Sequence, residues 1–442
     1  MSLQDHGLTP RLRPLPPRRT ATLSVLDIGT SKVVCLIAEL RPVPEGEALR
    51  GRTHLPRILG IGHQRSLGLK GGAVVDLEAA ESAIRPAIHA AERMAGVEVQ
   101  SVIVNLTGGR LASHHFAAHV PVRSGMVCAS DIGGVLEVAS NHTLRPGRAV
   151  LHALPTGFSL DGQNQIVEPA GMIGERLGVD LHVVTAEAAS SRNLMLAVER
   201  SHLDVEAVVA TPYASGLATL ADDEAEMGVV VIDLGGGTTS CGVFSDGHLV
   251  HADAIAVGGH HITMDLARGL TTTVSAAERL KTLYGTAISS GSDDRDMVAV
   301  PHMGDDDERE VVRHVPRAQL VRIIRPRVEE ILELVRDRLR NAGYAAQAGR
   351  RIVLTGGASQ LLGLPEVARR ILDGEVRIGR PLGIRGLPEA GKGPSFSAAV
   401  GLLVYPQVAH IEHFEPRRNG LFGGASEGGY VERVGRWFRE SF

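Results

Sequence analysis

The chain has 442 residues, of which 46 are Lys or Arg and 50 are Asp or Glu, so its formal net charge at pH 7 is −4. This balance excludes a protein that binds nucleic acid through a large overall positive charge. Hydrophobic residues make up 43% of the chain, enough for a large core, and we expect neither a membrane-spanning helix nor a secretory signal. The cysteines Cys35, Cys128 and Cys241 are too widely spaced for a disulfide framework or a zinc site and favour a reducing compartment.

The predicted elements begin after a Pro- and Arg-rich segment, residues 1–20, which favours a solvated basic tail or a short motif for an anionic partner. From Ala21, two apolar runs around a glycine turn predict a β-hairpin. Residues 77–96 have the apolar spacing of a helix that ends at its glycine, and residues 99–106 predict a strand.

The middle of the chain predicts a small separate module of short strands around one helical stretch, within residues 107–175. Residues 180–210 then predict a strand, a helix and a strand. Further on, residues 318–341 have the pattern of an amphipathic helix, in which we expect Pro326 to force a break or a kink. A predicted strand over residues 351–355 runs directly into a pair of glycines.

The segment around Asp233 repeats the segment around Asp27. Each consists of an apolar strand that ends in Asp-x-Gly, a turn rich in small and hydroxyl residues, and a second apolar strand. The two aspartates lie 206 positions apart in the chain. A repeat at that distance indicates two homologous domains rather than a solenoid.

The two repeated turns carry little side-chain bulk, so backbone N–H groups and hydroxyls can approach phosphate oxygens. One such turn is usually only a tight turn, but two at equivalent positions can close on a polyphosphate from both sides. Each has an aspartate that can hold Mg²⁺ directly or through water. A third glycine pair, after the strand at 351–355, can place backbone against a nucleoside. The candidate nucleotide-binding residues are Gly29, Thr30, Ser31, Lys32, Gly235, Gly236, Gly237, Thr238, Thr239, Gly356 and Gly357, and the candidate metal ligands are Asp27 and Asp233.

In this order the three motifs resemble the two phosphate loops and the adenosine loop of the actin-like ATPase superfamily. Within it, the chain most resembles the FtsA family of bacterial cell-division proteins over about residues 21–442. The resemblance implies an α/β actin-like ATPase fold in which two homologous domains clamp ATP and Mg²⁺, with an inserted small subdomain and a C-terminal amphipathic helix. The segments that carry it are residues 24–32, 228–242, 256–265, 353–364, 397–405 and the C-terminal helix.

The resemblance also implies a division into domains. After the tail at 1–20, we expect a first actin-like domain at 21–78 and 176–208, the inserted subdomain at 79–175, a second actin-like domain at 209–251 and 321–410 with its small subdomain at 252–320, a linker at 411–429 and a membrane-targeting helix at 430–442.

Two further site features follow from the resemblance. Glu278 and Lys281 match a Glu-x-x-Lys pair that flanks the ribose and base in similar proteins, although such a pair is also common on helix surfaces. Where MreB-like ATPases have a glutamate that orients the attacking water, this chain has Thr211, and a hydroxyl is a poor general base. We therefore expect nucleotide binding with at most slow hydrolysis, in which Thr211 and Asp233 position water or magnesium.

The last thirteen residues have the pattern of an interfacial amphipathic helix. The alternatives are a helix that docks on the protein's own core or in a partner's groove. Residues 412–442 contain five Arg and five Glu, so electrostatic attraction to lipid is small. We expect one copy to bind a membrane marginally and an array to bind well. The predicted membrane residues are Val431, Val434, Trp437, Phe438 and Phe442.

The resemblance implies a peripheral protein that polymerises on the cytoplasmic face of the inner membrane at the division septum. The resemblance implies four partners: the C-terminal tail of FtsZ, other copies of itself, later divisome membrane proteins and membrane lipid; nucleic acid is not among them. Arg317 matches a basic position in the surface that receives the FtsZ tail, although a solvated basic face is the alternative. The expected partner-binding residues are Arg313, Arg317, Arg322 and Arg325.

Other proteins with the same fold suggest alternative functions: a small-molecule kinase, a chaperone-type ATPase, or an MreB-like or pilus-assembly protein. A kinase is disfavoured because the chain has a membrane helix and no clear aspartate to activate an acceptor. A chaperone would need a substrate-binding domain after the ATPase region.

Overall fold

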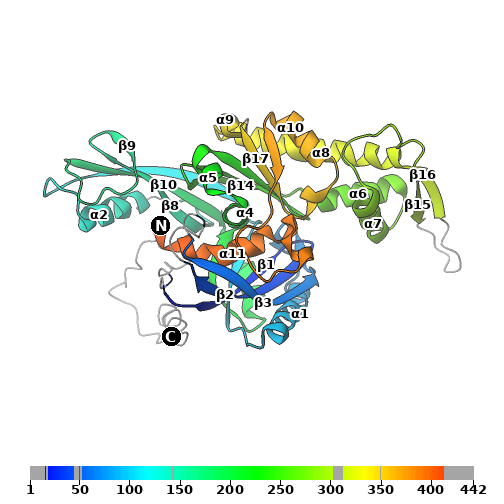
Figure 1. The fold of residues 1–442 in the computed structure, drawn as a ribbon, viewed down its shortest axis with the longest axis horizontal. Coiled ribbons are helices and arrows are strands. Elements are labelled where there is room, and N and C mark those ends of the chain that lie inside the picture. The colour runs from blue at the N-terminus through cyan, green and yellow to red at the C-terminus, as the bar shows by residue number, and fades with distance from the viewer. Residues whose placement is uncertain are drawn as a thin grey trace.

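Two five-stranded sheets form the centre of the molecule, with a small module at one end and a helix-rich end opposite to it (Figure 1). This computed structural model describes residues 18–43, 52–141, 144–301, 312–348 and 350–412, together with Leu15 and Leu49.

The first sheet has the order β11-β6-β1-β2-β3. Its β1, β2 and β3 are antiparallel neighbours, whereas β6 pairs in parallel with both β1 and β11. The predicted hairpin is confirmed, because Asp27 pairs with Val34 in the β1–β2 ladder. The strands are β1 (Ala21–Ile28), β2 (Lys32–Pro42), β3 (His54–Arg65), β6 (Ser101–Leu106) and β11 (Asp204–Ala210).

The second sheet repeats this arrangement with the order β14-β13-β12-β17-β18. Three antiparallel strands are again followed by two parallel ones. The predicted pair of homologous domains is thereby confirmed in topology. The strands are β12 (Val229–Leu234), β13 (Thr239–Ser245), β14 (His248–Ile255), β17 (Arg351–Thr355) and β18 (Glu375–Ile378).

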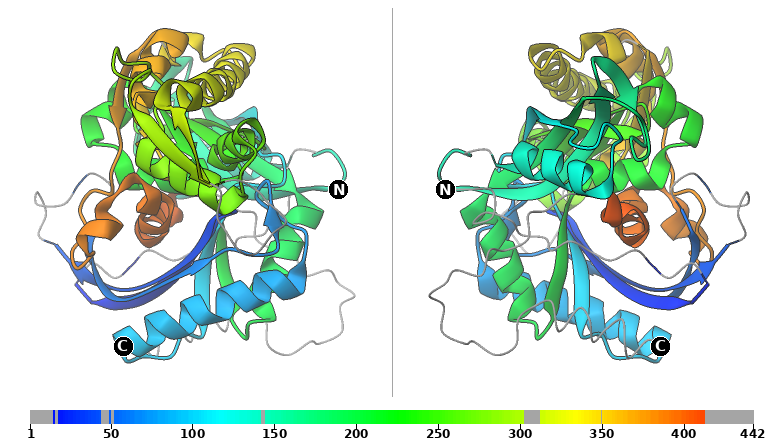
Figure 2. Two further views of the ribbon diagram at one scale, coloured as in Figure 1. Left: turned by 90° about the vertical axis from the view of Figure 1, so that its right-hand side faces the viewer. Right: turned by 90° about the vertical axis from the view of Figure 1, so that its left-hand side faces the viewer.

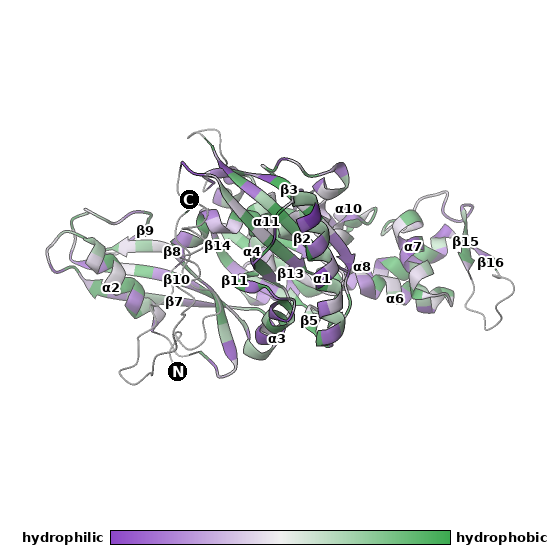
Figure 3. Ribbon diagram, turned by 90° about the horizontal axis from the view of Figure 1, so that it is seen from below, coloured by the Kyte–Doolittle hydropathy of each residue, from purple (hydrophilic) through white to green (hydrophobic). Residues whose placement is uncertain are grey.

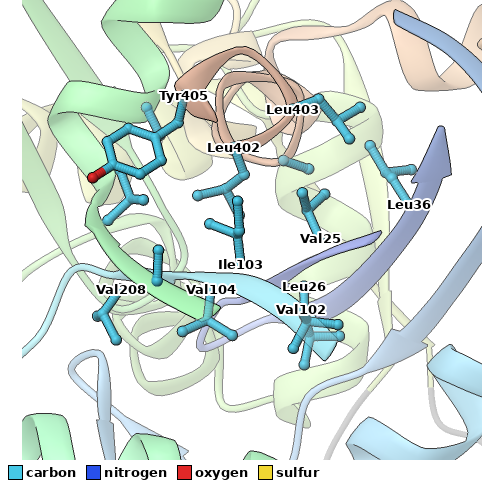
Figure 4. Packing of buried hydrophobic residues seen from close by; sticks show 14 of the residues in the cluster. Val25, Leu26, Leu36, Val102, Ile103, Val104, Val208, Leu402, Leu403 and Tyr405 are labelled. Carbon is cyan, nitrogen blue, oxygen red and sulfur yellow. The ribbon is translucent and has the colours of Figure 1, made fainter. Parts of the chain in front are cut away.

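Helices cover both faces of the first sheet: α1 (Leu77–Ala95) and α3 (Ala188–Glu199) pack on one face and α11 (Ser397–Val408) on the other (Figure 2). The predicted helix over 77–96 is confirmed by its ends, since Asp76 accepts the N–H of Ala79 and Gly96 closes the last turn in the left-handed conformation. Leu402, Leu403 and Tyr405 of α11 lie against the core side chains of β1, β2 and β6 (Figure 4).

The two halves of the molecule meet where α11 crosses α4 (Thr211–Thr219). This placement differs from the predicted division, which assigned residues 321–410 to the second domain, because α11 buries its apolar side chains against the first sheet. A Cβ added at Gly401 would overlap the carbonyl oxygen of Ala214, so the two backbones touch at the crossing.

Three helices pack against the second sheet and share its core: α6 (Gly259–Leu270), α8 (Arg317–Asn341) and α10 (Leu364–Leu372). Of the predicted break or kink at Pro326, the break is absent, because α8 is continuous from Arg317 to Asn341. Proline removes one backbone donor, but Ile324, Val328 and Ile331 on either side are buried and hold both halves of the helix on the core.

The inserted module is a four-stranded sheet of order β7-β10-β8-β9 with α2 (Ala129–Ser140) packed on it. It begins later than the predicted residue 79, since α1 packs on the first sheet and β6 is one of that sheet's strands. It extends past residue 175 because β10 is one continuous strand. Its strands are β7 (Ala112–Pro121), β8 (Arg148–Leu160), β9 (Gln163–Ile166) and β10 (Arg176–Glu187).

The opposite end of the molecule contains α7 and the β15–β16 hairpin (Figure 1). It differs from the predicted subdomain at 252–320 in that β14 belongs to the second sheet. The remaining elements are α7 (Val274–Tyr284), β15 (Met297–Pro301), β16 (Val312–Pro316), β4 (Leu69–Lys70), β5 (Ala73–Val74), α5 (Asp222–Met227) and α9 (Ala345–Ala348).

Both ends of the described chain are fastened to the body. Leu15 is only 5% exposed and packs in the first core, so the predicted tail contributes one core residue, and the carbonyl of Arg19 accepts a hydrogen bond from His54. At the other end Glu412, expected in the linker, is buried and accepts a 3.0 Å hydrogen bond from His152 Nδ1 of the inserted module. Because His152 Nε2 accepts the N–H of Ala210, the ring is neutral and carries its proton on Nδ1.

The rest of the predicted linker and the whole predicted membrane helix, residues 413–442, lie outside the described residues. No helix in the described ranges combines the length and apolarity that crossing a membrane requires.

Candidate nucleotide site

The two predicted phosphate loops form the same turn and face one another. Gly29 N donates to Lys32 O at 2.9 Å, and Gly235 N donates to Thr238 O at the same distance. A Cβ added at Gly236 would lie 2.9 Å from Ser31 Cβ, too close for two carbon atoms. The turns thus bring the backbones of both domains together, as two loops closing on a polyphosphate require.

Asp27 and Asp233 lie at equivalent positions near the ends of β1 and β12, and each is 7% exposed. Asp27 Oδ1 accepts a 2.7 Å hydrogen bond from Asn105 Nδ2, and Asp233 Oδ2 accepts one from the Ser215 hydroxyl. Burial raises the pKa of both carboxyls, that of Asp27 to about 6; Lys32 opposes the shift for both, while Asp233 adds to it for Asp27. The charges at this point are therefore poorly hydrated, which favours binding of a compensating cation.

Lys32 of the first loop reaches across to the segment before α11. Its Nζ donates to Ser395 O at 2.5 Å and lies 4.0 Å from the centroid of the Phe396 ring. Burial lowers the pKa of this lysine, while Asp27 and Asp233 act against that shift. The one cation among the predicted phosphate-loop residues is thus held by Ser395 and Phe396, within electrostatic reach of both carboxylates.

The third glycine motif lies beside the second loop. Gly356 has a φ of +84°, which disfavours other residues, and an added Cβ would overlap Asp233 Oδ1. The start of α6 links the two motifs: Gly259 N donates to Gly235 O at 2.9 Å, and a Cβ on Gly259 would be 2.8 Å from Ala358 Cβ. Gly357 begins the 3₁₀ turn that follows.

The Glu278–Lys281 pair of α7 joins this assembly through the first turn of α6. Lys281 Nζ lies 2.7 Å from Glu278 Oε2 and donates to Gly259 O at 3.1 Å. The hydroxyl of Thr263 donates to Glu278 Oε2 at 2.5 Å. Hydrogen bonds to Lys281 and Thr263 hold the pKa of Glu278 below its usual value against the opposing effect of burial. The pair therefore lies beside the glycine that touches the second loop.

Thr211 is the first residue of α4 and is 5% exposed. Its Oγ1 lies 2.5 Å from Thr107 Oγ1 and accepts a 3.2 Å hydrogen bond from Asn105 Nδ2. Asn105, Thr107 and Ser215 were not among the predicted site residues. The signal for Asn105 was available, since it is the one amide inside the apolar strand β6; Ser215 has no comparable signal.

The donor set fits a magnesium nucleotide. In the described part of the chain, no three or more His, Cys, Asp or Glu side chains lie together as a metal-binding group. The two aspartates of the loops supply only oxygen ligands, and Mg²⁺ commonly takes one or two carboxylates together with phosphate oxygens and water. The glycine turns supply backbone donors for the phosphates.

The four predicted partner-binding arginines lie around the start of α8, and three of them have partners within the chain. Arg313 donates to Leu270 O at 3.0 Å, and Arg325 Nε lies 2.9 Å from Glu329 Oε1. Arg317 donates to Tyr284 O at 3.0 Å, with its Nη1 3.5 Å from Asp293 Oδ1. Arg322 is exposed. The predicted membrane residues lie outside the described residues.

Comparison with known families finds two matches. Residues 230–401 match the family described as cell division protein FtsA, and residues 108–185 match an SHS2 domain inserted in FtsA. The second range coincides closely with the four-stranded module, which runs from β7 to β10.

Comparison with individual proteins indicates the same family. The chain is 54% identical to a cell division protein FtsA from Rhizobium meliloti (strain 1021), over 99% of this chain and 98% of that one. It is 34% identical to a cell division protein FtsA from Escherichia coli (strain K12), over 94% and 97% of the two chains.

Solved structures support the fold alone. One is a PilM–PilN type IV pilus biogenesis complex, with a TM-score of 0.57 and 17% identity over 90% of this chain and 99% of that one. Another is MreB5 of Spiroplasma citri bound to ADP, with a TM-score of 0.50 and 14% identity over 88% of this chain and 97% of that one.

Proposed function

This chain belongs to the FtsA family of bacterial cell-division proteins, and from that membership we propose that it binds ATP with Mg²⁺ between its two homologous domains. The observation that supports this most is the pair of turns in contact, each closed by the same hydrogen bond and each beside a buried aspartate. In this proposal the turns hold the phosphates, Asp27 and Asp233 hold the magnesium or its water, and Gly356 and Gly357 lie against the adenosine. Glu278 and Lys281 flank the ribose and base.

The test of nucleotide binding replaces Gly236 with Leu in the full chain. The new side chain collides with Ser31 of the opposite loop, so we expect affinity for a fluorescent ATP analogue to fall below detection. Gly291→Leu is the matched control, since a Cβ there meets no atom within 4 Å, and its affinity should equal that of the wild type. Undiminished binding by Gly236→Leu would contradict the assignment.

We propose that ATP turnover is slow. Thr211 and Asp233 are the groups available to orient water or magnesium, and a hydroxyl is a poor base at neutral pH. Its contacts with Thr107 and Asn105 also hold the Thr211 hydroxyl in place. A wild-type rate near the ordinary enzyme value of about 10 per second would show that another residue acts as the base.

The cellular role that we propose is that of a membrane adaptor. The protein polymerises on the cytoplasmic face of the inner membrane at the division septum and tethers the FtsZ ring there by binding the FtsZ C-terminal tail. It also helps to recruit later divisome membrane proteins. Family membership supports this role, as do the C-terminal amphipathic pattern and the inserted module, which projects from one end of the body (Figure 1).

For the FtsZ tail we propose the basic group at the start of α8: Arg313, Arg317, Arg322 and Arg325. Reversing the charge at Arg317 would also remove contacts within the chain, because its guanidinium donates to Tyr284 O and lies beside the buried Asp293. We therefore choose Arg322→Glu, which changes an exposed charge, with exposed Arg340→Glu at the far end of the same helix as the control.

Fluorescence polarisation with an FtsZ tail peptide measures the effect. Arg322→Glu should weaken binding by about tenfold or less, as for one exposed charge pair, and more strongly at low salt. The control should bind like the wild type. Equal losses of affinity in both variants would indicate a general charge effect. An unchanged affinity in Arg322→Glu would show that the tail does not bind at this basic group.

A further inference from the structure

The side chain of Asn105 contacts two parts of the candidate site from the strand between them. It is 2% exposed, in β6. Its Oδ1 accepts the N–H of Ile28 at 2.8 Å, and its Nδ2 donates to Asp27 Oδ1 at 2.7 Å and to Thr211 Oγ1 at 3.2 Å.

These three contacts allow only one orientation of the amide. The backbone N–H of Ile28 can only donate, so the atom that faces it must be the carbonyl oxygen. Both N–H groups then point toward Asp27 and Thr211. A flipped amide would set its oxygen against the Asp27 carboxylate and leave the Ile28 N–H opposite another donor. The network is thus directional, which makes it suited to holding acceptors in place.

The position of β6 explains why one side chain reaches both groups. β6 is the parallel neighbour of β1 on one side and of β11 on the other. β1 ends at the first phosphate loop, and β11 is followed directly by Thr211. Thr107, two residues after Asn105, contacts Thr211 from the same strand end at 2.5 Å.

We propose that Asn105 is a positioning residue of the nucleotide site, which holds the Asp27 carboxylate and the Thr211 hydroxyl in one fixed arrangement for a magnesium nucleotide. This inference rests on the proposed function. Asn105 takes one acceptor position on Asp27 Oδ1 and leaves Oδ2 free of this hydrogen bond. Without the amide, the carboxylate and the hydroxyl lose the donor that they share.

The test compares the dissociation constants of a fluorescent ATP analogue in Mg²⁺ and in EDTA for the full chain. The ratio of the two constants reports what magnesium contributes to binding. Asn105→Ala removes the amide, and Asn105→Leu removes it while retaining most of the volume. Ser201→Ala is the control, because it loses a different buried hydrogen bond, that from Ser201 Oγ to Ala197 O at 3.2 Å.

In both Asn105 variants we expect magnesium to strengthen binding by about tenfold less, or lower still, than in the wild type. This is the size expected for a hydrogen bond to a charged group. Their affinity in EDTA should change little, and Ser201→Ala should keep the wild-type ratio. A purely structural role would weaken binding equally with and without Mg²⁺ and would overturn the proposal, as would an unchanged ratio. A wild type that binds no nucleotide would instead refute the proposed function.

Discussion

His182 of β10 is a fully buried histidine at the junction between the inserted module and the second domain. Its Nδ1 donates to Leu249 O at 2.7 Å, and Nε2 lies 2.9 Å from Ser113 Oγ. Its ring stacks on that of His115, with centroids 4.9 Å apart. Burial, with smaller contributions from His115, His251 and His152, lowers the pKa of His182 to about 3.

This burial makes stability depend on pH with a definite sign. Between the usual histidine pKa of 6.5 and the folded value of about 3, the unfolded chain binds a proton at His182 that the folded chain does not. Above pH 6.5, His182 therefore has no effect on how the free energy of unfolding depends on pH. Below pH 6.5, its burial lowers the free energy of unfolding by about 1.4 kcal/mol per pH unit.

The prediction is tested with His182→Gln. Denaturant unfolding between pH 7 and 5 should show a smaller loss of stability in the variant than in the wild type, by about 1 kcal/mol per pH unit. His89→Gln is the control, because the His89 side chain is 77% exposed, and it should keep the wild-type slope. Parallel slopes in the wild type and His182→Gln would show that His182 titrates normally.

The crossing of α4 and α11 joins the two halves of the molecule. At Gly401 an added Cβ would overlap backbone atoms of Ala214, which cannot move aside as a side chain can. Gly401→Ala should therefore lower the free energy of unfolding by about 2–3 kcal/mol or more, despite the better helix propensity of alanine.

Thermal or denaturant unfolding checks this value. Gly133→Ala in α2 is the matched control, since a Cβ there meets nothing within 4 Å, and it should be neutral or stabilising by up to about 1 kcal/mol. If Gly401→Ala is as stable as the control, the two helices can separate at the crossing without cost.

At the scale of the whole molecule, we predict that membrane residence depends on assembly. The residues concerned lie outside the described ranges, so the prediction rests on the sequence. Burial of five large apolar side chains contributes about 10 kcal/mol at best, and ordering the segment costs about 1 kcal/mol or more per residue. One helix thus binds marginally, and neighbouring helices in a filament raise each other's effective concentration.

Liposome sedimentation over a range of protein concentrations measures this dependence. The wild type should show a steep, cooperative rise in the bound fraction. Trp437→Glu should stay in the supernatant, because it places a charge in the apolar face, whereas Trp437→Phe should still pellet. A hyperbolic wild-type curve would contradict the dependence on assembly, and a pelleting Trp437→Glu would contradict the anchor.

The sequence by itself determined the features that local patterns encode. The two hairpins followed from pairs of apolar runs around glycine turns, and α1 followed from its spacing and its closing Gly96. The 206-residue repeat indicated two homologous halves, which the matching order of the two sheets confirms. These signals are readable because strand alternation, helix spacing and turn chemistry act over a few residues.

Only the tertiary structure decided which distant residues meet. Asn105 gains its contacts because two parallel neighbours place β1 and β11 on either side of β6, and no local pattern encodes that pairing. α8 passes through Pro326 because its flanking side chains are buried. The colouring by hydropathy shows hydrophobic residues gathered in central elements such as β2, β13 and α11, but such a pattern does not say which of these elements meet (Figure 3). Such choices depend on packing between segments far apart in the chain, where burial outweighs local preference.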